Sequence, residues 1–180
     1  MRERPRRRGK YFYLNPIDIQ QRRKMQDIWQ NEAVIAQAQL LARSWKHWTG
    51  RELLPGSFSP EAFSEKLFRA PFVVLSHGAE PDPILNYGNA AALALWEMTW
   101  DEFIRTPSRL TAEASARAER ARLLATVAAR GFAEGYSGVR ISKSGRRFRI
   151  ARATVWNLIS ETGAPCGQAA MFAEWEYLTP

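Results

Sequence analysis

The 180-residue sequence contains a single cysteine, Cys166, and only two histidines, His47 and His77. One cysteine excludes an internal disulfide and a cysteine metal site, which fits a reducing compartment. No apolar run approaches the roughly 18 residues that a membrane-spanning helix needs. The arginine-rich start also lacks the apolar segment that follows it in a secretory signal. We therefore expect a cytoplasmic protein without a membrane partner.

Residue patterns typical of hydrolytic enzymes are also missing. Ser76 and His77 are adjacent in a predicted strand, so their side chains point to opposite faces and cannot pair as nucleophile and base. Asp101 and Glu102 fit the first turn of a helix, and no other pair of carboxylates stands out. Neither histidine has a second ligand at a spacing suited to a metal. We expect no metal site and a protein that is not an enzyme.

The net charge of +8 is concentrated at the N-terminus. Six basic residues and one acidic residue fall within the first ten positions, which places +5 of the charge there. We interpret residues 1–14 as a basic, disordered arm. Such an arm can neutralise phosphates, but no element that reads nucleic acid accompanies it. Weak, salt-sensitive binding to nucleic acid is the most that we expect from it.

A long amphipathic helix is predicted from Asn15 to about Trp48. Asn15 is a favourable N-cap and is followed by proline at the first helical position, while Gly50 supplies the stop. Apolar residues recur at steps near three, four or seven, which is typical of a helix with one buried stripe. We expect this stripe to cover a sheet, to pair with its copy in a homodimer, or both. The residues expected in that contact are Ile28, Leu41 and Trp45.

Two strands and several helices are predicted after this helix. Their limits follow from breakers, from caps and from a capping box between Thr99 and Glu102. The last helix of the group is expected to end at Gly131. The predicted elements are a helix over 60–68, strands over 71–77 and 84–89, and helices that begin after Asn89, Thr99 and Thr111.

Residues 131–175 predict a three-stranded antiparallel meander. Gly145 can take the positive φ that the first short hairpin loop needs. In the central strand, Val155 and Trp156 point to opposite faces and are both apolar, whereas a half-solvated sheet alternates apolar with polar residues. Both faces should therefore be covered, one of them by the domain's own helices. The three strands are predicted over 136–142, 147–159 and 168–177.

This order of elements is typical of the PAS architecture, in which a five-stranded antiparallel sheet carries helices on one face. At residue level, FVVLSHGAEPDPILNYGNAAALALWEMTWDEFIRTPSRLTAE, GYSGVRISKSGRRFRIARATVWNLI and GQAAMF closely resemble the MEKHLA family. That family is a PAS-like domain found alone in bacteria and algae and at the C-terminus of plant class III homeodomain leucine-zipper proteins. The resemblance runs from about Phe68 to Trp175 and leaves out the first 56 residues. The hexapeptide that names the family is absent.

The resemblance implies an α+β PAS-like domain with an amphipathic helical extension in front of it. PAS-like domains hold a small molecule or cofactor in a pocket, or only a protein partner on the sheet, and signal through flanking helices. The main interpretation is a small-molecule sensor that forms a homodimer. The alternatives are a ligand-free dimerisation or protein-docking module, and nucleic-acid association through the arm. The predicted parts are the arm over 1–14, a helical extension and linker over 15–57, and the PAS-like domain over 58–180.

The resemblance does not identify a cofactor, but the sequence itself argues against a flavin adduct and against haem. A flavin-adduct photosensor needs a cysteine on a pocket helix, whereas Cys166 is predicted in the last hairpin loop. A haem-binding PAS domain usually offers a histidine from the helix before the meander, and that helix contains none.

Six polar or aromatic residues are candidates for lining the pocket. Each also has a structural explanation, such as a helix cap for Asn89, a clamp on loop carbonyls for Arg109, or core packing for the tryptophans. For Gln168 the alternative is an outward-facing side chain, and for Asn157 it is a bond to a buried backbone group. The candidate ligand-binding residues are Asn89, Trp96, Arg109, Trp156, Asn157 and Gln168.

Overall fold

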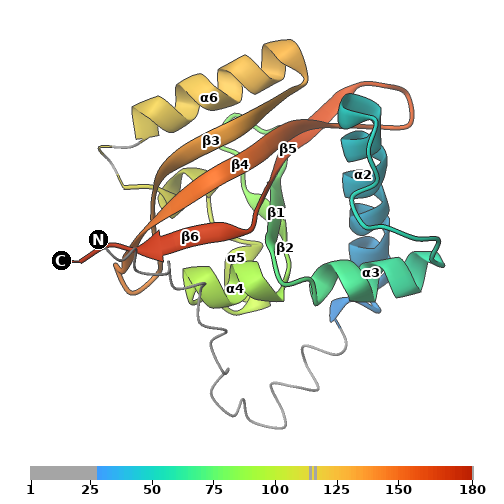
Figure 1. The fold of residues 1–180 in the computed structure, drawn as a ribbon, viewed down its shortest axis with the longest axis horizontal. Helices are drawn as coiled ribbons and strands as arrows, with labels where there is room; N and C mark the ends of the chain where they lie inside the picture. Colours follow the sequence, from blue (N-terminus) through green and yellow to red (C-terminus); the bar gives the residue numbers. More distant parts are fainter. Residues whose placement is uncertain (1–27, 114, 116, 180) are drawn as a thin grey trace, which may run out of the picture.

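The computed structural model describes residues 28–179 except Ala114 and Ala116 (Figure 1). The predicted arm over residues 1–14 and the predicted helix start at Asn15 lie outside this part. Among the described helices, none combines the length and the apolar character needed to cross a membrane.

An antiparallel sheet forms the centre of the fold, with the strand order β2-β1-β5-β4-β3 and with β6 paired to β4. The first strand in the sequence therefore lies beside the fifth, and the two outer strands of this order are β2 and β3. This arrangement confirms the predicted α+β, PAS-like fold. The strands are β1 (Val73–His77), β2 (Leu85–Gly88), β3 (Phe132–Ile141), β4 (Arg147–Ile159), β5 (Pro165–Phe172) and β6 (Glu174–Tyr177).

The last predicted strand, over residues 168–177, is divided into β5 and β6, which both pair with β4. Thr154 pairs with Met171 on one side of the break and Ala151 pairs with Glu174 on the other, so the register is unchanged across it. Arg152 lies opposite the break with a φ of 52°, a conformation that is uncommon for a residue with a side chain. The backbone of β4 at this residue thus interrupts the ladder.

Six helical segments surround the sheet in the part of the chain that the structure describes. The capping box between Thr99 and Glu102 is present as predicted, because each side chain binds the backbone of the other residue. Gly145 has a φ of 86° in the predicted hairpin loop. The segments are α2 (Glu32–Thr49), α3 (Pro60–Phe68), α4 (Ala90–Trp96), α5 (Trp100–Phe103), the 3-10 helix η1 (Ser108–Thr111) and α6 (Arg117–Arg130).

Two predictions about the helices were wrong. The N-terminal helix does not run unbroken to Trp48, because the Asn31 side chain accepts a hydrogen bond from Ala33 N and starts α2 afresh at Glu32. The last helix before the meander does not begin at Thr111. That residue ends η1 instead, and its hydroxyl donates to the Ser108 carbonyl.

Helices cover the sheet on both faces, and α2 supplies the cover that the sequence left open. Figure 1 shows α2 and α6 on opposite sides of β4. Leu41 and Trp45 of α2 are buried, and the Trp45 ring meets Trp156 of β4 edge to face at 5.0 Å. The sheet-covering role predicted for Leu41 and Trp45 is therefore present within one chain. Ile28 is half-buried and packs beside the same cluster.

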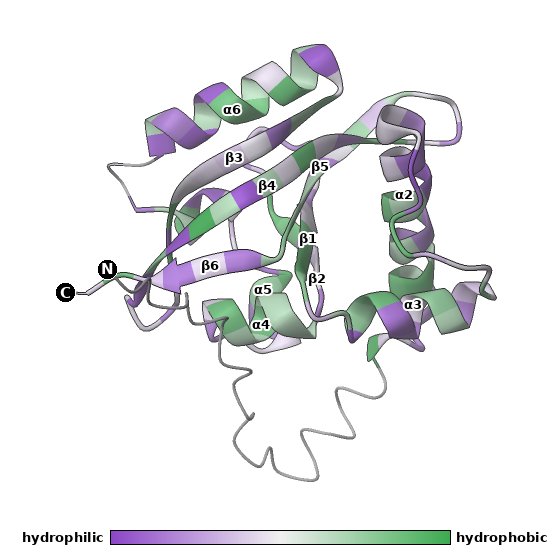
Figure 2. Ribbon diagram, viewed as in Figure 1, coloured by the Kyte–Doolittle hydropathy of each residue, from purple (hydrophilic) through white to green (hydrophobic). Residues whose placement is uncertain are grey.

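The other face of the sheet carries a second apolar cluster. Trp96 of α4 is surrounded edge to face by Phe103, Phe148 and Phe172 at ring distances of 5.2 to 6.3 Å. In Figure 2, β1 is mostly hydrophobic, since it begins with Val73, Val74 and Leu75, whereas β6 is hydrophilic. The interior is thus split into an α2 layer and an α4/α6 layer with the sheet between them.

Candidate functional site

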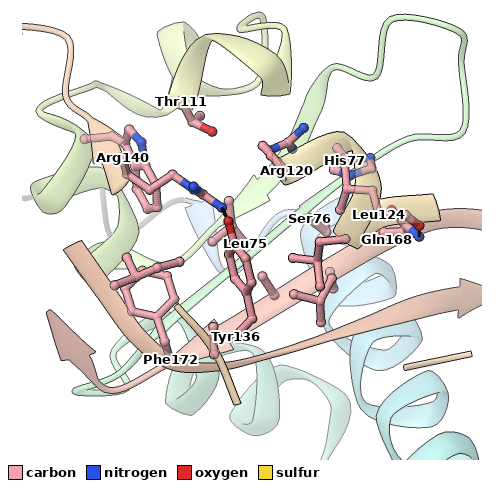
Figure 3. Close-up of a pocket in the computed structure, with 17 residues that line it drawn as sticks. Leu75, Ser76, His77, Thr111, Arg120, Leu124, Tyr136, Arg140, Gln168 and Phe172 are labelled. Atoms are coloured by element: carbon pink, nitrogen blue, oxygen red, sulfur yellow. Dashed lines mark hydrogen bonds between the residues drawn. The ribbon is translucent and has the colours of Figure 1, made fainter. Parts of the chain in front are cut away.

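A small cavity of about 50 Å³ lies between the sheet and α6 (Figure 3). One water molecule needs roughly 10–15 Å³ on the same measure, so the cavity has room for a few water-sized atoms. Its walls come from β1, β3, β4, β5, α4, α6 and the end of η1. Apolar side chains form most of the lining, among them Leu75, Leu123, Leu124, Ile150, Val155 and Phe172.

Two arginines enter this apolar lining from different elements. Arg140 of β3 is only 6% exposed, donates to the Val139 carbonyl at 2.8 Å and to the Tyr136 hydroxyl at 3.2 Å, and lies over the tyrosine ring. Arg120 comes from α6 and is half-buried. Burial and the charge of Arg140 lower the pKa of Arg120 to about 10. Among the described residues, neither guanidinium has a carboxylate within 4.0 Å.

His77 lines the cavity at the end of β1 and is neutral in its surroundings. Its Nδ1 donates to the Gly78 carbonyl at 2.8 Å, so Nε2 is the acceptor of the ring and is buried without a partner among the described residues. Burial lowers the pKa of His77, and the nearby Arg120 adds to this effect. Figure 3 places Arg120 between Thr111 and His77. An acceptor and two cationic donors therefore border one small space.

Ser76 is the other polar residue of β1 at this cavity. Its hydroxyl donates to Asn86 Oδ1 at 2.6 Å and accepts from Gln37 Nε2 of α2 at 3.1 Å. Two side-chain amides therefore hold the hydroxyl. This agrees with the prediction that Ser76 and His77 point to opposite faces of the strand. These bonds connect the cavity wall with α2.

Gln168 and Asn157 fasten α6 to the sheet at one end of the cavity. Gln168 lines the cavity, and its Nε2 donates to Asn157 Oδ1 at 3.0 Å and to the Leu124 carbonyl at 2.9 Å. Asn157 Nδ2 in turn donates to the Val127 carbonyl at 2.9 Å. Asn157 satisfies buried backbone groups and is not itself part of the lining.

Asn89 has a structural position away from the cavity. It is fully buried and caps α4 by accepting from Ala92 N, while the same oxygen accepts from Val74 N. Its amide donates to the Leu67 and Phe72 carbonyls. Both the oxygen and the nitrogen of the Asn89 amide are thus bonded to backbone groups. Asn89 does not line the cavity, contrary to the prediction that it binds a ligand.

The remaining predicted residues divide between the cavity and other places. Trp96 lines the cavity as predicted. Trp156 lies on the opposite face of the sheet against Trp45, because neighbouring residues of β4 alternate between faces. Arg109 is exposed and forms a two-point ion pair with Asp82, with Nε to Oδ1 and Nη2 to Oδ2 both at 3.0 Å. Trp156 and Arg109 therefore do not belong to this site.

The sequence reasoning missed both arginines, His77 as a lining residue and Tyr136. No pattern in the sequence pointed to Arg140, because the apolar residues Val139 and Ile141 flank it, and alternation in a strand would then place the arginine outward. Arg120 stands one turn before Leu123 and Leu124 on α6, on the side that meets the sheet. Both arginines were hidden by the usual expectation that arginine is solvated.

Cys166 is not among the residues that line the cavity. Cys166 was predicted in a hairpin loop, but it is the second residue of β5, because pairing with β4 begins at Pro165. It packs with the α2 cluster, and burial raises the pKa of its thiol. Across residues 28–179 as described, no three His, Cys, Asp or Glu side chains gather in a way that would hold a metal ion.

A wider groove opens on the surface near α5 and the β3–β4 hairpin. Its volume is about 680 Å³, and it is open to solvent. Lys143 and Glu102 form an ion pair of 2.6 Å at this groove, next to the half-exposed Leu110. The groove is larger than the cavity but does not enclose a ligand.

The comparisons with known proteins agree with this fold. The sequence model of the MEKHLA domain matches residues 35–177. The match includes most of α2, so the prediction that the first 56 residues lie outside the family region was wrong for residues 35–56, whereas residues 1–34 do lie outside the match. No curated protein sequence matches the chain.

Solved PAS-type structures resemble the chain at low sequence identity. A PAS domain from Colwellia psychrerythraea superposes with a TM-score of 0.54 at 12% identity and covers 64% of this chain and 93% of its own. A light-oxygen-voltage domain studied with a flavin analogue gives 0.51 at 14%, with coverage of 65% and 84%. An RNA-binding light-oxygen-voltage receptor gives 0.55 at 14%, with coverage of 69% and 36%. At these identities the likeness concerns the fold alone.

Proposed function

The chain belongs to the MEKHLA domain family, and from this premise we propose that it is a sensory module that binds a small molecule in the cavity beneath α6. The observation that carries the proposal is the cavity itself, because polar side chains from β1, β3, β5 and α6 converge on an otherwise apolar space. Small-molecule sites typically combine an apolar lining with a few polar groups that fix the ligand.

The helix α2 is the element that we propose to report the state of the cavity. Gln37 of α2 donates to Ser76, which lines the cavity. Trp48 of α2 donates from Nε1 to the Asn157 carbonyl at 2.9 Å, and the Asn157 side chain binds Gln168 and α6. A ligand that shifts Ser76 would therefore alter the Gln37 contact of α2, and one that shifts Gln168 would alter the Trp48 contact through Asn157.

We propose a binding role and not a catalytic one. Ser76 and His77 each have their own partners, with Asn86 and Gln37 at the serine and Gly78 at the histidine. No proton relay connects these two residues in the described part of the chain. The chemistry offered to a ligand is hydrogen bonding and positive charge.

A homodimer remains a proposal, and it needs a different surface from the one first expected. Leu41 and Trp45 are used within the chain, because they pack against Trp156 of β4. A second copy would have to meet other parts of α2 or the open groove beside Leu110. Native mass spectrometry gives the number of subunits directly.

A ligand-free docking module is the second candidate, and the small volume of the cavity favours it. Pockets for drug-sized ligands usually enclose at least about 300 Å³, whereas this cavity has about 50 Å³. The partner protein would then use the open groove near α5. Nucleic-acid association through the basic arm is a third candidate, and its mark is an affinity that falls steeply with salt and disappears when residues 1–10 are deleted.

A thermal-shift screen of small metabolites tests the sensory proposal. The matched variants are Ala153→Leu, which fills the cavity, and Ala164→Leu, which adds the same side chain in the exposed β4–β5 loop. We expect hits to stabilise the protein and Ala164→Leu but not Ala153→Leu. A ligand at a hundred times its Kd adds about 2.7 kcal/mol to the free energy of unfolding.

Hydrogen exchange over residues 32–49 then tests the role of α2. We expect a hit to change the exchange of these amides in the protein and to change it less in Trp48→Phe, which lacks the donor to Asn157. Hits that stabilise Ala153→Leu equally would remove the cavity from the proposal. A screen without hits, together with a protein partner captured at the groove, would favour the docking module.

A further inference from the structure

The two arginines of the cavity are an unusual pair, because they bring positive charge into a mostly apolar space. Arg140 is 6% exposed, and its bonds go to two neutral acceptors, the Val139 carbonyl and the Tyr136 hydroxyl. Arg120 lines the same space from α6. Each charge disfavours the other, and burial disfavours both. The described residues supply no carboxylate within 4.0 Å to offset them.

An anion between Arg120 and Arg140 would offset both charges and accept their hydrogen bonds. Guanidinium groups bind carboxylates with charge-assisted hydrogen bonds, which are stronger than bonds between neutral groups. The Tyr136 hydroxyl accepts a bond from Arg140, so its own proton is available to a further acceptor. Figure 3 places the Arg140 guanidinium beside this hydroxyl at the centre of the cavity. Three donors from two elements can therefore face one anionic head.

The size and lining of the cavity restrict the kind of anion. A space of about 50 Å³ admits a group of a few atoms. Leu123, Leu124 and Val155 contribute apolar walls that would exclude a multiply charged anion but accept a short alkyl group. These features favour a single carboxylate with a small apolar tail over phosphate or sulfate.

We infer that the cavity is a site for a short-chain monocarboxylate, whose charged head is held by Arg120, Arg140 and the Tyr136 hydroxyl. The inference rests on the proposed function, because it names the ligand class of that same cavity. A bound carboxylate would also compensate the positive charges of the two arginines, which packing alone does not do.

Calorimetric titration of the full chain tests the inference with propionate and its neutral analogue propionamide, in a buffer without carboxylates. The variants are Arg120→Gln and Arg140→Gln, with Arg122→Gln as the matched control, because Arg122 is an exposed arginine of the same helix. We expect propionate to bind the protein and Arg122→Gln. Each cavity variant should raise the Kd at least about tenfold, since a hydrogen bond to a charged group contributes that much. Propionamide should not compete.

Arg140→Lys is included because it keeps the charge if Arg140→Gln fails to fold, which circular dichroism reports. We expect it to bind propionate more weakly than the protein but more tightly than Arg120→Gln. Equal weakening by Arg122→Gln would overturn the inference, because the effect would then come from general surface charge. Equal binding of propionamide would overturn it as well, yet would leave the sensory proposal standing, since a neutral ligand would occupy the cavity. If neither compound binds and the metabolite screen also gives no cavity hits, both the inference and the sensory proposal fail.

Discussion

Trp48 and Asn157 connect the two helical layers through the sheet. The Trp48 indole donates to the Asn157 carbonyl at 2.9 Å from the α2 side, and the Asn157 side chain donates to the Val127 carbonyl at the end of α6. One residue of β4 therefore binds a helix on each face. A substitution that moves Asn157 from one face of the sheet should therefore affect the helix on the other face as well.

The contact of α2 with the sheet should account for a large part of the stability. Leu41 is fully buried against this face, so Leu41→Asp places an unpaired charge inside it. We expect a loss of at least about 3 kcal/mol in the free energy of unfolding, measured by urea denaturation. Ala36→Asp is the control, because Ala36 is exposed on the same helix. Equal midpoints for both variants would mean that α2 is a free appendage.

Asn89 should be more important for stability than an ordinary helix cap. Asn89→Ala removes a cap and leaves the Leu67 and Phe72 carbonyls and Val74 N without their side-chain partner. We expect a cost of roughly 3 kcal/mol, because each buried unpaired group costs about 1–3 kcal/mol. Ser59→Ala removes only the exposed cap of α3 and should cost about 1 kcal/mol. Similar losses in the two variants would contradict a buried network around Asn89.

Two glycines allow the Trp48 contact to be measured separately from backbone strain. Gly131 and Gly135 both have positive φ, at 94° and 75°. A Cβ at Gly131 would lie 2.3 Å from the Trp48 ring, whereas a Cβ at Gly135 would meet nothing within 4 Å. We expect Gly135→Ala to cost about 1 kcal/mol from strain. Gly131→Ala should cost at least about 1 kcal/mol more than Gly135→Ala in thermal unfolding. Equal costs would show that Trp48 yields without penalty.

His77 should make stability depend on pH. Burial lowers its pKa in the folded protein, with Arg120 lowering it further and the Gly78 carbonyl and Glu80 acting in the opposite direction. Below the usual histidine pKa of about 6.5, the unfolded chain binds a proton that the folded protein does not. Stability should therefore fall as the pH is lowered from 7 to 5.

His77→Gln should reduce the slope of stability against pH in this window. Urea unfolding at half-unit pH steps measures this slope in both proteins. An unchanged slope would mean that His77 takes up its proton as readily in the folded state as in the unfolded chain.

The sequence predicts best those features that depend on neighbouring residues. The limits of β4 agree with the predicted run over 147–159, and the capping box at Thr99 and the turn at Gly145 are present, because each depends on a few adjacent residues. The break between β5 and β6 was not predicted. It lies opposite Arg152 in another strand, and no local signal in residues 168–177 reveals that pairing.

The candidate site was harder to predict than the fold, because burial depends on which face of the sheet a residue joins. Trp96 and Gln168 do line the cavity, whereas Trp156 belongs to the α2 face and Arg109 pairs with Asp82 outside the site. Arg140 is buried only because the register of β3 against β4 points it inward next to Tyr136. A single sequence does not contain that register.

The position of β5 has a consequence for how the chain is made. Among the described strands, β5 is the one that pairs with both β1 and β4, and it follows both of them in the chain. A nascent chain that stops before Pro165 would hold two separate hairpins, with Val73, Val74 and Trp156 lacking their native neighbours. Contacts between segments so distant in the sequence form slowly, and exposed strands of this kind aggregate. The sheet should therefore close only after β5 has been synthesised, and the two hairpins should need protection by a chaperone until then.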